Sequence, residues 1–70
     1  MKDTYNVNFK YARGVWRGKR VVPLDDYLQE GNLKLELYSE TQIKPVICEI
    51  LKKKAGIKTP YVVDINYTRE

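Results

Sequence analysis

The longest regular pattern of apolar and polar residues lies between residues 41 and 55, where apolar positions repeat with a helical period. The apolar stripe comprises Ile43, Val46, Ile47, Ile50 and Leu51. The spacing i, i+3, i+4, i+7 and i+8 places these side chains on one face of a helix. Pro45 is poorly tolerated inside a helix, so we expect regular helix from about residue 43, capped by Ser39 or Thr41 and followed by Gly56.

The other apolar stretches are short and alternate with period two, which is typical of β-strands. We predict strands over residues 4–12, 19–22, 33–38 and 61–68. One face of the first strand carries Tyr5, Val7, Phe9 and Tyr11, and one face of the last carries Tyr61, Val63, Ile65 and Tyr67. A turn at Arg17-Gly18 joins the first two strands, because glycine accepts the positive φ that such turns require.

Residues 23–31, PLDDYLQEG, separate the second and third strands. Pro23 cannot donate to a strand ladder and therefore ends the second strand. Proline at a first helical position, Asp25 and Asp26 at the positive end of the helix dipole and Gly31 at the stop favour a short helix. A pair of turns fits the same residues.

The resulting order is β-β-short α-β-α-β, which indicates an α+β fold: a small three- to four-stranded, mostly antiparallel sheet packed on one amphipathic helix. We expect residues 1–70 to form a single small domain. Its predicted core comprises Val7, Phe9, Leu35, Leu37, Ile43, Val46, Ile47, Ile50, Leu51, Val63 and Ile65. A chain of this size buries only about 60% of its unfolded surface, so a second copy or a partner is one route to further stability.

The residue inventory argues against an enzyme. The chain has no histidine and only one cysteine, Cys48, which removes the usual general base, the Ser-His and Cys-His pairs and a structural zinc site. Cys48 lies at the edge of the apolar stripe, where we expect a structural or half-exposed thiol. Asp25, Asp26 and Glu30 are explained by the helix dipole better than by a metal ion. We therefore expect no catalytic residue, no metal and no cofactor.

Charge is distributed unevenly along the chain, although the net charge is only +4. Residues 1–22 carry six basic and one acidic side chain, and residues 23–40 carry one basic and five acidic ones. Within the first segment, a predicted hairpin combines basic and aromatic side chains. The candidate nucleic-acid-binding residues are Lys10, Arg13, Trp16, Arg17, Lys19 and Arg20. Cations neutralise phosphates, and an exposed ring can stack on a base or wedge into a groove.

Simpler explanations exist for both basic clusters of the chain. The hairpin could be solvated, with Trp16 folded onto the sheet and its charges serving solubility. A second basic cluster, Lys52 to Lys54 with Lys58, is also the favourable charge expected at a helix C-terminus. Whether the two clusters share one face decides how much weight they carry.

Two functions follow from these patterns. The first is a small non-enzymatic nucleic-acid-binding or regulatory accessory protein that contacts phosphates through the basic hairpin. The alternative is a protein–protein module, such as an inhibitor, an adaptor or an oligomer subunit, that uses sheet edges and exposed tyrosines. The N-terminus lacks an apolar signal-peptide region and no apolar run approaches the ~20 residues of a membrane span, so we expect a cytoplasmic protein without membrane or small-molecule partners.

Overall fold

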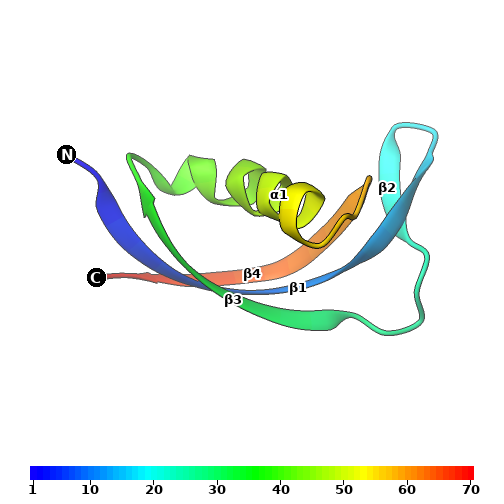
Figure 1. Cartoon of the computed structure of the whole chain (residues 1–70), viewed down its shortest axis with the longest axis horizontal. Coiled ribbons are helices and arrows are strands. Elements are labelled where there is room, and N and C mark those ends of the chain that lie inside the picture. Colours follow the sequence, from blue (N-terminus) through cyan, green and yellow to red (C-terminus); the bar gives the residue numbers. More distant parts are fainter.

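The computed structural model describes residues 1–70, and it shows a four-stranded antiparallel sheet packed against one helix. The sheet is curved, and the helix lies on its concave side (Figure 1). The elements are β1 (Asp3–Arg17), β2 (Arg20–Pro23), β3 (Gln29–Leu37), the 3-10 turn η1 (Glu40–Gln42), α1 (Ile43–Lys54) and β4 (Pro60–Arg69). The predicted α+β class, a mostly antiparallel sheet on a single amphipathic helix, is confirmed.

Strand β1 is the centre of the sheet, because it pairs with each of the other three strands. Its first half pairs with β3 from Asp3 to Tyr11, and its last four residues pair with β2. Strand β4 runs antiparallel to the middle of β1, from Tyr5 to Arg13. The two chain termini lie at one end of the molecule, and the β1–β2 hairpin extends beyond the helix at the other end (Figure 1).

The core forms where α1 covers the first half of β1. Val7 and Ile47 are completely buried, and Tyr5, Phe9, Leu35 and Leu37 are nearly so. The apolar stripe of α1 behaves as its period predicts, with Ile43, Ile47 and Leu51 buried, whereas Val46 and Ile50 are partly exposed at its margins. Tyr5 and Ala12 are buried as well, although they were not among the predicted core residues.

Strand β4 departs from the predicted alternation because it contains a β-bulge. Its register with β1 shifts between Asn8 and Lys10, so that Asp64 and Ile65 face the single residue Phe9. Asp64 adopts a φ of 53°, the left-handed conformation that aspartate tolerates better than most residues. Before the bulge the even-numbered residue Val62 is buried, at 6% exposure. After the bulge the odd-numbered residue Ile65 packs on the core. The predicted core position of Val63 is therefore wrong.

The segment between β2 and β3 contains no helix, so the predicted short helix is wrong. Residues 24–27 form bends, and β3 begins at Gln29, earlier than predicted. Gly31 pairs with Phe9 inside the sheet rather than ending a helix. A Cβ atom at Gly31 would lie 2.5 Å from the Phe9 ring, so the glycine makes room for that ring.

Helix α1 begins and ends close to the predicted residues. Ser39 caps the preceding 3-10 turn, since its side-chain oxygen accepts a hydrogen bond from the Thr41 amide. Regular helix then starts at Ile43, two residues before Pro45, and Gly56 follows its end with a φ of 69°. No helix of the structure has the length and apolar character needed to cross a lipid bilayer.

Candidate nucleic-acid interface

The β1–β2 hairpin is attached to the start of β4 by the backbone around Gly14. The Gly14 amide donates to the Thr59 carbonyl at 2.7 Å, and the Leu24 amide donates to the Arg13 carbonyl at 2.8 Å. A Cβ atom at Gly14 would lie 2.6 Å from the Val21 side chain and 2.8 Å from the Thr59 oxygen. Only glycine allows this close approach, which fixes the hairpin against the segment that follows α1.

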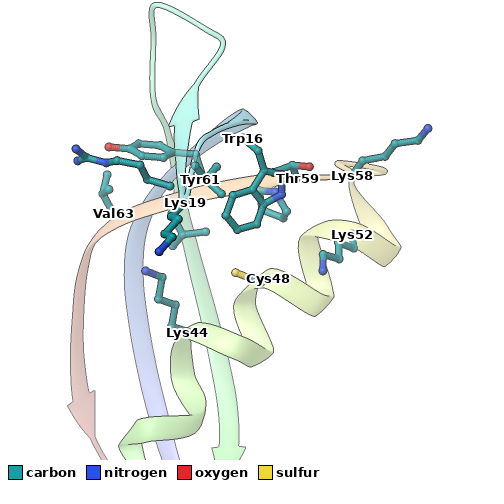
Figure 2. Close-up of a pocket in the computed structure, with 13 residues that line it drawn as sticks. Trp16, Lys19, Lys44, Cys48, Lys52, Lys58, Thr59, Tyr61 and Val63 are labelled. Carbon is teal, nitrogen blue, oxygen red and sulfur yellow. The ribbon is translucent and has the colours of Figure 1, made fainter.

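A groove of about 500 Å³ lies between this hairpin, the start of β4 and one side of α1. The hairpin contributes Trp16, Lys19, Arg20 and Val21; α1 contributes Lys44, Cys48 and Lys52; and the segment from Lys58 to Val63 forms the remaining wall. Figure 2 shows the Trp16 ring lying between the strands and the C-terminal half of α1, with Lys19 and Lys44 directed toward one another. The three helix residues recur every fourth position and therefore share one face.

The groove is strongly basic. Its lining includes five cationic side chains and no acidic one. The five cations are Lys19, Arg20, Lys44, Lys52 and Lys58. None of them forms a salt bridge, whereas Lys53, next to Lys52 on the same helix, pairs with Glu49 at 3.7 Å. The positive charge of the groove is thus open to a ligand.

The aromatic wall of the groove is exposed. Trp16 is 62% exposed and does not pack into the core, so the alternative that this ring folds onto the sheet is wrong. Tyr61, Pro60, Val62 and Val63 add apolar surface beside it. An exposed indole next to unpaired cations offers a flat apolar surface and positive charge within the same groove.

The structure separates the six predicted binding residues into two groups. Trp16, Lys19 and Arg20 line the groove together with Lys52 and Lys58, so the two basic clusters share this surface in part, whereas Lys53 and Lys54 lie outside it. The other three lie outside this groove.

Each of those three has a different position. Lys10 lies 3.9 Å from Asp64 at the bulge of β4. Arg17 is exposed at the turn of the hairpin and makes no salt bridge. Arg13 is held by Asp25 through two guanidinium hydrogen bonds, the shorter of 2.8 Å.

The Arg13–Asp25 pair also shifts the titration of both groups. The hydrogen bond from Arg13 lowers the pKa of the Asp25 carboxyl below its usual range, and the same bond raises the pKa of the guanidinium. Arg13 is thereby committed to the loop that follows β2. This ion pair holds the loop, and a role of Arg13 in nucleic-acid binding stays a prediction.

Sequence reasoning did not find Lys44 and Tyr61 as site residues. The signal for Lys44 was present, because Lys44, Cys48 and Lys52 follow the i, i+4, i+8 spacing beside the apolar stripe. No comparable signal exists for Tyr61, because its position in the groove depends on the β4 bulge.

Comparisons of the chain with protein-family models, with curated proteins and with solved structures give no match. The chemistry of the groove follows from its side chains. Ammonium and guanidinium groups bind phosphate oxygens, and an exposed indole stacks on planar rings.

Proposed function

We propose that this protein is a small, non-enzymatic nucleic-acid-binding protein with an accessory or regulatory role in the cytoplasm, and that its basic groove contacts phosphates. The observation that carries the proposal is a group of five cations, none of which forms a salt bridge, in a groove whose lining contains no acidic residue. A polyanion is the ligand class that such a charge distribution favours.

The arrangement also has a cost to the fold that a bound polyanion would remove. Like charges held near one another destabilise the compact state through repulsion. Elsewhere on the molecule Lys10, Arg13, Lys34, Lys53 and Arg69 each have an acidic partner within 4 Å. Eight of the 13 cationic side chains have no such partner, and five of these eight line the groove, which favours a binding role over a role in stability.

The salt dependence of oligonucleotide binding tests this proposal, with adjacent lysines as a matched pair. Affinity for a generic oligonucleotide should fall steeply between low and physiological salt, because bound phosphates release counterions. Lys52→Ala should weaken binding and reduce the slope of log K against log salt by about one unit. Lys53→Ala removes the same charge from the next position, outside the groove, and should change the slope less. Absence of binding at low salt by a folded protein would refute the proposal.

Cys48 provides an independent test of where the oligonucleotide lies. It is the only cysteine, and it lines the groove with a partly exposed thiol. Binding in the groove should slow alkylation of Cys48 by a neutral maleimide in proportion to occupancy. An alkylation rate that does not change at saturating oligonucleotide would place binding elsewhere on the protein.

A protein partner is the second candidate function, and one observation favours it. The loop between β2 and β3 exposes Leu24, Tyr27 and Leu28, with Tyr27 at 85% exposure. Neighbouring exposed apolar side chains are a feature of protein interaction surfaces. If this candidate is correct, Tyr27→Ala should abolish capture of the partner, and the interaction should depend only weakly on salt.

A further inference from the structure

We infer that the basic groove takes single-stranded nucleic acid and not duplex, with one unpaired base stacked on the Trp16 ring. This inference rests on the proposed nucleic-acid-binding function and adds the class of nucleic acid and its mode of binding. It follows from three properties of the groove: its size, the position of the indole and the placement of the cations around it.

The size of the groove limits what can enter it. A volume of about 500 Å³ falls within the range of roughly 300–1,000 Å³ that is typical of pockets for small molecules. A nucleotide is a ligand of that class, whereas a DNA duplex is a rod too wide to enter. A duplex could therefore contact only the rim of the groove and would leave the recessed surface unused.

The Trp16 ring lies in the groove, where an unpaired base can stack on it. In Figure 2 the ring lies inside the groove, between the strands and the C-terminal half of α1, and not at the tip of the hairpin. Inside a duplex both faces of each base are covered by its neighbours. Stacking on an aromatic side chain therefore requires a base that is already unpaired or has been flipped out.

The cations are distributed so that a strand could pass the ring with its phosphates neutralised on both sides. Lys19 and Arg20 come from the hairpin that carries Trp16, and Lys44 and Lys52 come from the facing helix. Lys58 lies beyond the end of α1 and extends away from the groove centre (Figure 2). A stacking ring flanked by cations on two walls is the arrangement by which proteins hold single strands without sequence preference.

Trp16 is the only tryptophan, so its fluorescence reports on this site alone. The experiment titrates the protein at low salt with three probes of about ten residues: oligo(dT), an abasic strand with the same number of phosphates, and a blunt DNA duplex. Oligo(dT) should quench Trp16 emission and bind about 5- to 150-fold more tightly than the abasic strand, which is the range expected for one stacked base. The duplex should bind more weakly than oligo(dT) at equal phosphate concentration.

Variants make the result specific to the ring. Trp16→Ala should remove the preference for oligo(dT) over the abasic strand, which a competition assay with labelled oligonucleotide measures. Trp16→Phe should restore part of that preference. Tyr27→Ala removes a more exposed ring that does not line the groove and should leave the preference unchanged. Because Trp16 is outside the core, its removal should not unfold the protein.

The outcomes separate this inference from the proposed function. If the abasic strand and oligo(dT) bind equally and Trp16 emission does not change, or if the duplex binds most tightly, the inference is wrong while phosphate binding stands. If none of the three probes binds, both are wrong. A preference for oligo(dT) that persists in the Trp16→Ala protein would also contradict the assigned role of the ring.

Discussion

The two halves of β1 belong to one continuous strand but differ in burial. In residues 3–11, alternate side chains are buried under α1, and Tyr5, Val7 and Phe9 belong to the core. In residues 13–17 the strand continues beyond the helix, and no residue is buried. A strand can thus serve the fold along one half and present an exposed surface along the other.

The difference arises from what covers the strand and not from the strand itself. Period-two alternation predicts that one face can be buried, but burial requires a second layer of structure. Helix α1 lies on the concave side of the sheet, and the hairpin projects past it (Figure 1). The hairpin that this projecting half forms with β2 carries Trp16, Lys19 and Arg20, which line the groove beside the helix.

The largest effect is expected when a side chain is removed from the core between α1 and the first half of β1. Ile47→Ala should lower the free energy of unfolding by roughly 2–5 kcal/mol, because Ile47 is 0% exposed and the domain is small. Ile50→Ala should cost less, since Ile50 is only partly buried. Urea denaturation followed by circular dichroism measures both, and equal losses for the two variants would show that α1 packs with a different face.

The next change is at Gly14, where the two halves meet. Gly14→Ala should cost about 1–3 kcal/mol of stability, because the added methyl group meets the Val21 side chain and the Thr59 carbonyl. It should also weaken oligonucleotide binding by displacing the hairpin from the groove. Gly18→Ala is the control, since a Cβ atom there has open space and only the turn conformation is strained. Thermal melting at one pH compares the two, and full stability of Gly14→Ala would contradict the close approach.

The general form of the molecule could be predicted from its sequence, because it depends on local periodicity. The stripe from Ile43 to Leu51 and the alternation around Val7 specify a helix and a strand without reference to the rest of the chain. The bulge at Asp64 could not be predicted, because nothing in PYVVDINYT distinguishes a regular strand from one with an extra residue. Because of this one extra residue, Val62 points into the core in place of Val63.

The candidate site could be predicted only where its residues are close together in the sequence. Basic and aromatic residues close together in sequence, such as Trp16, Lys19 and Arg20, were identified as a cluster. That they meet Lys52 and Lys58 depends on the curvature of the sheet, which is a tertiary property. The sequence does not distinguish Arg13 from Arg20. Only the structure shows that Arg13 forms an ion pair with Asp25.

A smaller effect is expected from the Arg13–Asp25 pair, which anchors the loop after β2. The folded state lowers the pKa of Asp25, so the pair contributes stability that is present above the usual pKa of aspartate and is lost as pH falls through the lowered value. Asp25→Asn should therefore melt slightly below the wild-type protein at neutral pH, and the difference should vanish in acid. Arg13 is exposed and Asp25 is only partly buried, so the change in melting temperature should be small. A difference that grows in acid would contradict the pairing.

The smallest effect is expected at Cys48, which lines the groove without belonging to the core. Cys48→Ser should change stability by less than about 1 kcal/mol and leave oligonucleotide affinity nearly unchanged, because the thiol is only partly buried and carries no charge that phosphates require. Anisotropy titration of the variant measures the affinity. Complete loss of binding by a folded Cys48→Ser protein would show that the thiol itself takes part in the interaction.

The most direct measurement is to neutralise the groove and follow stability and binding in the same protein. A Lys44→Gln, Lys52→Gln, Lys58→Gln variant removes three cations that have no acidic partner. Its free energy of unfolding at low salt should be equal to or higher than that of the wild type, because repulsion is relieved. Its oligonucleotide affinity should collapse, and the salt slope should shrink by about three units. A less stable variant that still binds oligonucleotide with full affinity would contradict the division between a half that folds and a half that binds.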